Sequence, residues 1–286
     1  MRWGTGAESW HTRSVHSASE RELERKMGDL ALRLHELQSV VVAFSGGADS
    51  AFLAAMAHRE LGVEGAHAVT AVSPSLAGSE EADCRSLATE WGLRWTPVET
   101  HEMERAAYRS NDAERCYHCK AELMDVVGPI ASAAGATVVL GVNLDDLGDH
   151  RPGQRAAAEA GAAFPLVDAG FTKDDVRAAS RQLGLRTWDK PAAACLASRV
   201  PYGTEVTVGI LSRVERAESV LHALGFRQCR VRHYDNTARI EVDTADLAAV
   251  IERRADIVDA VRSVGYAYVT LDLEGFRSGN LNASLT

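Results

Sequence analysis

Apolar and polar positions alternate along this chain in blocks that predict strands and helices in turn. The continuous apolar run over 40–44 is typical of a buried parallel strand, and residues 51–57 then have the pattern of a helix. Further strands are predicted over 67–72, 94–99, 137–143 and 163–167, and further helices over 20–38, 79–91, 121–134, 154–160 and 172–184. This alternation predicts an open α/β sheet of parallel strands.

Local signals mark the ends of several of these elements. Ser19 is expected to cap the first helix and Thr172 the last one, because their side chains can accept from free backbone N–H groups. Gly92 is expected to end a helix. Pro97 cannot donate to a sheet ladder, so it is expected in an edge strand or at a strand end.

The pattern changes after residue 188, where Trp188-Asp189-Lys190-Pro191 looks like a junction. The elements predicted beyond it are a helix over 207–224, strands over 227–234 and 238–243, helices over 245–252 and 254–264, and a strand over 267–273. We therefore expect a disordered tail over 1–19, an α/β domain over 20–188 and a smaller α+β domain over 189–286.

The first strand runs into Ser45-Gly46-Gly47-Ala48-Asp49-Ser50, and a helix follows directly. Two glycines at a strand-to-helix turn let backbone N–H groups approach an anion, and the helix N-terminus adds partial positive charge. Ser45 and Ser50 can donate to phosphate oxygens, and Asp49 can hold Mg²⁺. The loop lacks the lysine of a G-x-x-x-x-G-K-[ST] P-loop. Its S-G-G-x-D-S pattern resembles the PP-loop ATP pyrophosphatases, which implies ATP cleavage to AMP and pyrophosphate.

A second ligand-facing loop is predicted after the strand over 137–143, since Asn143 begins a run rich in acids that ends in Pro152-Gly153. In parallel sheets, ligands bind at the carboxyl ends of strands. A solvated acidic turn is the alternative interpretation. The residues expected around ATP are Ala43, Ser45, Gly46, Gly47, Asp49, Ser50, Ser73, Gly141 and Asp145.

The five cysteines suggest a second chemistry. Cys116-x-x-Cys119 is compatible with a redox pair, half a zinc site or part of an iron–sulfur site, as well as with coincidence. Cys195 lies between Lys190 and Arg199, whose charges favour a reactive thiolate, although a buried apolar role remains open. Cys84 and Cys229 are expected in the core. Three cysteines can hold a [4Fe–4S] cluster with one iron left open.

Composition narrows the function classes. The net charge of −9 argues against a broad nucleic-acid footprint. The chain contains no long uncharged apolar run that would predict a transmembrane helix. Residues 1–19 lack the pattern of a secretory signal. We therefore expect a reduced, cytoplasmic location.

Taken together, these motifs resemble the LarE-type ATP-dependent sulfur transferases, which make the thiocarboxylates of the nickel-pincer nucleotide cofactor of lactate racemase. The resemblance covers about residues 20–286. The stretches that carry it are Phe44–Ser50, Leu140–Asp146 with Arg151-Pro152-Gly153, Lys190-Pro191 through Cys195–Arg199 with Pro201–Glu205, and Leu273–Gly279.

This resemblance implies a small-molecule nucleotide substrate, pyridinium biscarboxylic acid mononucleotide, which is adenylated on a carboxylate. It also implies a hexamer. Some members use the cysteine matching Cys195 as a sacrificial sulfur donor that ends as dehydroalanine. Others carry three cysteines and are thought to use a [4Fe–4S] cluster, and the Cys116, Cys119 and Cys195 set looks like that branch.

Further site residues follow in part from the resemblance. Arg230 and Arg232 share one strand face and match positions for the substrate phosphate, although a solvated face is the alternative. Ser198 and Arg199 are expected to hold substrate, and the pair Glu218 and Glu241 to bind a divalent ion. Other functions remain open: tRNA thiolation or ATP-dependent amidation by another PP-loop enzyme, or a sensor that binds ATP and an iron–sulfur cluster without turnover.

Overall fold

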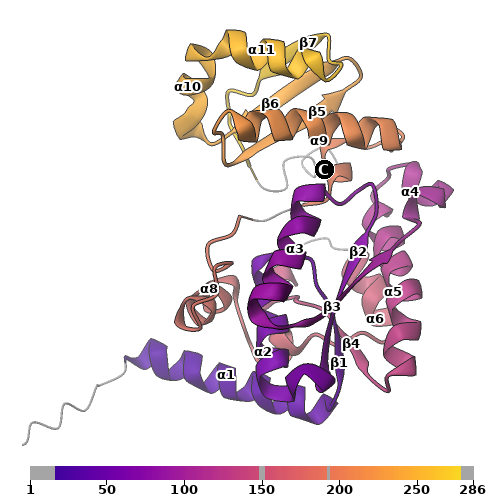
Figure 1. The fold of residues 1–286 in the computed structure, drawn as a ribbon, viewed down its shortest axis with the longest axis vertical. Helices are drawn as coiled ribbons and strands as arrows, with labels where there is room; N and C mark the ends of the chain where they lie inside the picture. The colour runs from indigo at the N-terminus through magenta and orange to yellow at the C-terminus, as the bar shows by residue number, and fades with distance from the viewer. Residues whose placement is uncertain (1–16, 148–151, 192–193, 278–286) are drawn as a thin grey trace, which may run out of the picture.

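A four-stranded parallel sheet forms the larger part of the molecule, in the computed structural model that describes residues 17–147, 152–191 and 194–277 (Figure 1). The strand order is β3-β2-β1-β4, with β1 at Val40–Ala43, β2 at Ala66–Val72, β3 at Arg94–Glu99 and β4 at Thr137–Val139. The edge position predicted from Pro97 is confirmed, because β3 pairs with β2 alone. The central strand β1 leads straight into the glycine loop, so the predicted phosphate site lies at the carboxyl end of the sheet.

Helices cover both faces of this sheet (Figure 1). One face packs against α2 (Ala48–Gly65), together with α1 (Ala18–Leu37), α3 (Gly78–Trp91) and α8 (Lys173–Gln182). The other face packs against α5 (Arg115–Ala133) and α6 (Pro152–Glu159). Because both faces are covered, β1 carries a continuous apolar run, Val40–Val42, that is almost fully buried.

A smaller mixed sheet, in the order β5-β6-β7, forms the second part of the molecule (Figure 1). Its strands β5 (Cys229–Tyr234) and β6 (Thr237–Val242) are antiparallel, and β7 (Tyr268–Leu271) is parallel to β6. The helices of this part are α9 (Val208–Ala223), α10 (Leu247–Glu252) and α11 (Arg254–Ser263). The predicted fold class, a parallel α/β sheet with a smaller α+β unit, is confirmed, whereas the boundary at residue 188 stays a prediction.

Short helical segments join these elements. They are η1 (Glu102–Glu104), α4 (Ala106–Arg109), η2 (Leu144–Asp146), α7 (Pro165–Asp168), η3 (Leu196–Arg199) and η4 (Thr244–Asp246). An apolar cluster links the two parts, since Tyr108 of α4 packs with Leu196 and Ala197 of η3 and with Leu211 of α9. None of the described helices is long and apolar enough to span a membrane.

Two local predictions are wrong. Helix α1 begins at Ala18, and its cap is Ser17, which exchanges hydrogen bonds with Glu20 in a capping box. Residues 17–19 of the expected tail thus belong to this cap and helix, and residues 1–16 lie outside the described ranges. Residues 163–167 form no strand, because Pro165 starts α7 and Ala163 makes only an isolated bridge to β4.

Candidate active site

The glycine loop joins β1 to α2 in the geometry of an anion site. Gly46 has φ +69°, and a Cβ there would lie 2.8 Å from the Cys84 sulfur, so both the turn and the packing require glycine. Gly47 is the N-cap of α2 and has no capping side chain, so the first backbone N–H groups of the helix are left for a ligand. The hydroxyl oxygens of Ser45 and Ser50 lie 3.0 Å apart across the loop.

Asp49 is held by the second predicted loop. The side-chain amide of Asn143 donates to the Asp49 carboxylate at 2.9 Å. Burial is the largest influence on the pKa of Asp49 and raises it above its usual range. A bound divalent cation would restore the charged form of this carboxylate. Gly141 allows the two loops to meet, because a Cβ there would lie only 2.7 Å from the Ser50 nitrogen.

The two acids that follow Asn143 have different environments. Asp145 is exposed and accepts a 2.6 Å hydrogen bond from the Lys173 backbone nitrogen at the start of α8. Asp146 is buried, lies 3.2 Å from the Lys173 ammonium and lines the main cavity. Asp146 was missed from the sequence, although the spacing Asn143-x-x-Asp146 is a capping-box signal that places it inward. The role predicted for Asp145 stays a prediction.

One cavity of about 740 Å³ collects most of the predicted residues. Of those expected around ATP, the cavity is lined by Ala43, Ser45, Gly47, Asp49, Ser50 and Gly141. Gly46, Asp145 and Ser73 are not part of its lining, and the Ser73 hydroxyl donates to Glu102. Cys116, Cys119 and Cys195 line the same cavity. The structure therefore places an ATP-type loop and three thiols around one space.

The cysteines come from two separate segments. Cys116 and Cys119 lie in the first turns of α5, which begins at Arg115, earlier than the residue 121 expected from the sequence. A spacing of three residues puts both on one helix face. Cys195 is the N-cap residue of η3. Burial, with Cys195 as the next cause, raises the pKa of Cys119 to about 12. This thiol is therefore protonated at neutral pH unless a cation displaces the proton.

Three thiolates are a typical donor set for iron. Within the described ranges, no three His, Cys, Asp or Glu side chains are placed to hold a single metal ion. In a cubane cluster each cysteine binds a different iron, so the three cysteines that line this cavity would hold one such cluster between them, and the cluster stays a prediction.

Arg115 is a neighbour of the cysteines that sequence reasoning missed. Its side chain is 5% exposed, and it donates to the Ala197 carbonyl at 2.9 Å. Its guanidinium lies 5.6 Å from the ring centre of Tyr202, which also lines the cavity. The arginine directly before Cys116 was the available signal. A buried cation here favours an anion among the thiols.

Arg230 and Arg232 both line the cavity from β5. Arg232 donates to the Ser198 carbonyl at 2.8 Å, and its Nε is a buried nitrogen without a hydrogen-bond partner among the described residues. Arg230 lies 5.2 Å from the ring centre of Phe276. A buried, unsatisfied guanidinium nitrogen is a strong donor for an incoming phosphate.

Arg199 and Glu218 form a buried two-point ion pair, with both N–O distances at 2.9 Å. Arg199 also donates to the Cys195 carbonyl at 3.0 Å, so it holds the cysteine loop rather than lining the cavity, whereas Ser198 does line it. Glu241 accepts hydrogen bonds from Arg232 at 2.7 Å and from Arg239 at 3.1 Å. Both carboxylates that were expected to bind a divalent ion, Glu218 and Glu241, are thus paired with arginines. The divalent-ion site stays a prediction.

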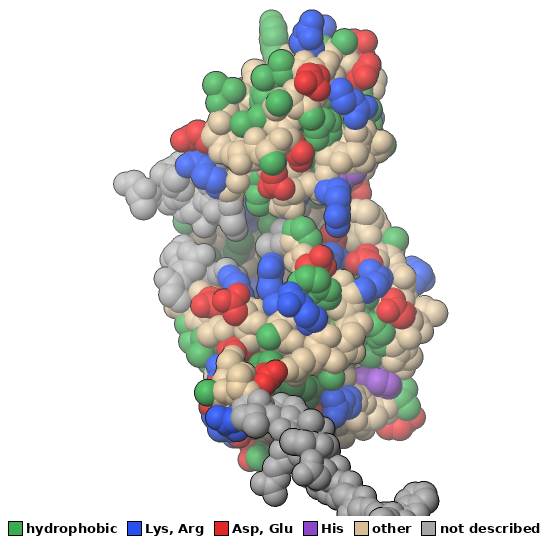
Figure 2. Space-filling view, turned by 90° about the vertical axis from the view of Figure 1, so that its left-hand side faces the viewer, with side chains coloured by type: hydrophobic (Ala, Val, Ile, Leu, Met, Phe, Trp, Pro, Cys, Tyr) green, Lys and Arg blue, Asp and Glu red, His purple; other side chains and the backbone are tan. Residues whose placement is uncertain are grey.

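The cavity is more basic than the chain as a whole. Its cationic lining residues outnumber Asp49 and Asp146, the acids that line it, and are Arg115, Lys120, Lys173, Arg177, Lys190, Arg230, Arg232 and Arg277. Figure 2 shows Lys and Arg side chains gathered near the waist between the two parts of the molecule. A basic cavity in a chain of net charge −9 fits a small polyanion better than a nucleic acid.

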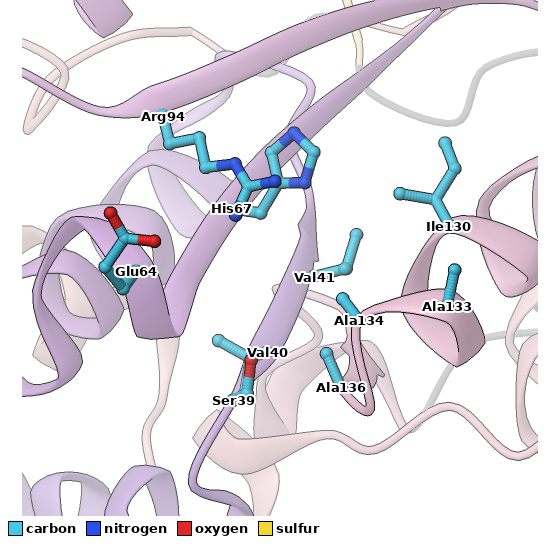
Figure 3. A pocket seen from close by; sticks show the side chains of 10 residues that line it. All are labelled: Ser39, Val40, Val41, Glu64, His67, Arg94, Ile130, Ala133, Ala134 and Ala136. Carbon is cyan, nitrogen blue, oxygen red and sulfur yellow. The ribbon is translucent and has the colours of Figure 1, made fainter.

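A second cavity, of about 470 Å³, lies at the amino ends of the strands (Figure 3). His67 and Arg94 lie next to each other on one side of it, and Ala133 and Ala134 of the α5 end lie on the other. Open parallel sheets bind their ligands at the carboxyl ends of the strands. The cavity at the glycine loop is therefore the candidate active site.

Comparisons with known proteins find one matching family and several relatives. The NAD synthase family matches residues 24–124. An uncharacterized protein of Synechocystis is 45% identical over 267 residues, which cover 92% of this chain and 99% of that protein. An uncharacterized protein of Methanocaldococcus jannaschii is 26% identical over 242 residues, which cover 84% of this chain and 92% of that protein.

A third relative carries a functional name. The pyridinium-3,5-bisthiocarboxylic acid mononucleotide synthase of Lactiplantibacillus plantarum is 38% identical over 265 residues, which cover 92% of this chain and 96% of that protein. The similarity thus includes both the parallel-sheet part and the smaller sheet. This chain therefore belongs to the LarE-type family of pyridinium-3,5-bisthiocarboxylic acid mononucleotide synthases.

Proposed function

We propose that this chain is an ATP-dependent sulfur transferase of nickel-pincer cofactor synthesis. It adenylates a carboxylate of pyridinium-3,5-biscarboxylic acid mononucleotide and converts it to a thiocarboxylate. The observation that carries the proposal is the single cavity lined by the glycine loop, three cysteines and two arginines of β5. The name of the Lactiplantibacillus plantarum relative, a pyridinium-3,5-bisthiocarboxylic acid mononucleotide synthase, supports the substrate class.

Activation of the carboxylate is the first step. A substrate carboxylate oxygen attacks the α-phosphorus of ATP, the bond to the β-phosphate breaks, and pyrophosphate leaves. The N-terminus of α2 and the hydroxyls of Ser45 and Ser50 stabilise the phosphate charge. Asp49, with Asn143 bound to it, holds the Mg²⁺ that accompanies ATP. Arg230 and Arg232 bind the substrate phosphate.

Sulfur transfer is the second step, and two routes fit the cysteines. In the sacrificial route, the Cys195 sulfur attacks the acyl carbon and AMP leaves. Loss of the Cys195 α-proton then breaks its Cβ–S bond, which leaves the thiocarboxylate on the substrate and dehydroalanine in the chain. In the other route Cys116, Cys119 and Cys195 hold a [4Fe–4S] cluster, which when bound would supply an iron open to exogenous sulfide.

We favour the cluster route because Cys116 and Cys119 face the same cavity as Cys195. The sacrificial route needs only Cys195 and gives no role to the other two.

The test is a reaction with ATP, Mg²⁺, the biscarboxylic acid mononucleotide and sulfide, on protein purified without oxygen. We expect pyrophosphate release and a product whose mass shows oxygen replaced by sulfur. Absence of both from iron-loaded and from iron-free protein would contradict the proposal. Pyrophosphate release that depends on tRNA would instead favour tRNA thiolation, and thiol-independent amide formation with ammonia would favour amidation. Tight ATP binding without pyrophosphate release would favour a sensor.

Iron analysis and two cysteine variants distinguish the two routes of sulfur transfer. Iron and acid-labile sulfide analysis of the same protein should give about four irons per chain for a cubane. Cys116→Ala should then abolish multiple turnover. In the sacrificial route the same variant should retain single-turnover transfer, and the chain mass should fall by the elements of H₂S. Cys229→Ala is the matched control, because Cys229 is fully buried in the core of the smaller sheet and is not part of the cavity lining.

A further inference from the structure

The glycine loop supplies no cationic side chain for the phosphates of ATP. Its own donors are the first backbone N–H groups of α2 and the hydroxyls of Ser45 and Ser50, and it lacks the lysine of a P-loop. When the α-phosphorus is attacked, the bond to its bridging oxygen breaks and negative charge grows on the leaving pyrophosphate. A fixed cation near that oxygen stabilises the charge. A cationic side chain for this role therefore has to come from another element of the cavity.

Most of the cationic side chains that line the cavity are already engaged by other residues. Lys190, for example, pairs with Glu80 at 2.8 Å and with Asp83 at 2.6 Å. Two exceptions, Lys120 and Arg177, make no hydrogen bond, ion pair or ring contact with another described residue. The other engaged cations are Arg115, Lys173, Arg230, Arg232 and Arg277. Two cations of the lining are thus available to a ligand.

The two available cations belong to different sides of the cavity. Lys120 lies on α5 beside the cysteine pair. Arg177 lies on α8, four residues after Lys173, so the two side chains share one helix face. The Lys173 ammonium lies 3.2 Å from Asp146, and its charge also acts on Asp49 of the glycine loop. This face of α8 is therefore on the nucleotide side of the cavity, and Arg177 is its free cation.

Helix α8 is firmly attached beside the two ligand loops. Its N-cap residue Thr172 and Asp175 exchange hydrogen bonds in a capping box, and Asp175 also pairs with Lys26 of α1 at 2.6 Å. The Lys173 backbone nitrogen donates to Asp145 at 2.6 Å, and the apolar face of α8 packs into the same core as α2. Only the Arg177 side chain itself therefore has to be ordered when it meets a ligand, which keeps the entropic cost of binding small.

We propose that Arg177 binds the β- and γ-phosphates of ATP and the pyrophosphate that they form on leaving. This inference rests on the proposed function. A guanidinium can donate two parallel hydrogen bonds to phosphate oxygens, which a lysine ammonium cannot do in the same fixed geometry. Its charge stabilises the pyrophosphate as the bond to the α-phosphorus breaks. The α-phosphate stays at the glycine loop, so Arg177 has no part in binding AMP.

The test measures the affinities for MgATP and for AMP by calorimetry, at low ionic strength because salt screens an exposed charge. Arg177→Gln should bind MgATP at least about tenfold more weakly, the loss expected for a hydrogen bond between charged groups. Its affinity for AMP should stay within twofold of wild type. Arg177→Lys keeps the charge without the two-point geometry and should fall between the two. In ATP–pyrophosphate exchange, the KM for pyrophosphate should rise in Arg177→Gln by a factor similar to the loss of MgATP affinity.

Arg181→Gln is the matched control. Arg181 lies one turn further along α8, but its guanidinium lies 4.0 Å from the ring centre of Trp188 and it is not part of the cavity lining. This variant should leave both affinities and the KM for pyrophosphate unchanged. Wild-type affinity for MgATP in Arg177→Gln would overturn the inference. So would an equal loss of MgATP and AMP binding, which would indicate a structural role, or a loss of MgATP affinity in Lys120→Gln in place of Arg177→Gln.

The two proposals fail in different ways, because binding of MgATP and AMP requires neither the mononucleotide nor sulfide. If Arg177→Gln loses affinity for MgATP alone but wild type forms no thiocarboxylate, the phosphate contact stands and the sulfur transfer falls. If wild type forms thiocarboxylate and Arg177→Gln binds MgATP as tightly as wild type, the proposed function stands and the role of Arg177 falls. A wild-type protein that binds no MgATP would overturn both.

Discussion

Gly141 is the point where the two ligand loops touch, and alanine there should separate them. A Cβ would lie 2.7 Å from the Ser50 nitrogen, 2.8 Å from the Asp49 carbonyl carbon and 2.9 Å from the Ser50 Cα. Non-bonded carbon atoms pack best at about 3.5–4.0 Å, so the loops must move apart by roughly 0.6–1.3 Å. All three contacts are backbone atoms of the first turn of α2, which cannot rotate away.

Gly141→Ala should lower both the stability of the protein and the rate at which the substrate carboxylate is activated. Overpacking of this kind costs about 1–3 kcal/mol, which corresponds to a fall in melting temperature of about 2–12 °C. The displaced turn carries Asp49 and Ser50. Misplacing groups by about 1 Å can cost about a hundredfold in rate, so ATP–pyrophosphate exchange should fall by about that factor.

The assays are ATP–pyrophosphate exchange and thermal unfolding, measured on wild type, on Gly141→Ala and on a control variant, Gly28→Ala. Gly28 lies within α1, and a Cβ there meets nothing within 4 Å. Alanine at this site should raise stability by about 0.5–1 kcal/mol and leave exchange unchanged. If Gly141→Ala exchanges pyrophosphate and melts like wild type, the close approach of the two loops does not position the ATP site, and this reasoning is refuted.

Two further predictions concern stability. Arg199→Ala should lower the free energy of unfolding, measured by urea titration, by about 3–5 kcal/mol, because it leaves the buried Glu218 carboxylate without its cation. A change below about 1 kcal/mol would show that water or another cation replaces the pair. Burial, and after it the charge of Arg94, lowers the pKa of His67, so the folded state favours the neutral imidazole. Stability is therefore lost as the pH falls below about 6.5, where the unfolded chain takes up a proton at this histidine. His67→Gln should therefore make the melting temperature fall less steeply between about pH 6.5 and 5, and an unchanged slope in that range would exclude His67 as a source of it.

Local patterning predicted most of the larger α/β part. The buried run of β1 and the glycine turn after it are short-range signals, so strand, loop and helix α2 could be located from adjacent residues. Pro97 likewise predicted an edge strand correctly. Predictions that depended on competing local signals failed: Ser17 rather than Ser19 caps α1, and because both serines have a glutamate three residues later, the capping-box pattern alone does not distinguish them.

The direction in which each side chain points could not be predicted from the sequence. The residues Asp145 and Asp146 are adjacent acids, yet one faces solvent and the other the cavity, because η2 turns the chain between them. Glu218 and Glu241 looked like free ligands, whereas Arg199 and Arg232 from other elements engage them. Such partners are set by tertiary packing and leave no local pattern.

The sequence by itself therefore determined the chemistry available: a glycine loop suited to ATP, three candidate sulfur ligands, and arginines on one strand face. Only the tertiary structure decided which of these groups share one space. It brings Cys195, nearly eighty residues after Cys116 in the sequence, to the same cavity. The physical reason is that local propensity acts within a helix or strand, whereas the contents of a cavity depend on how distant elements pack.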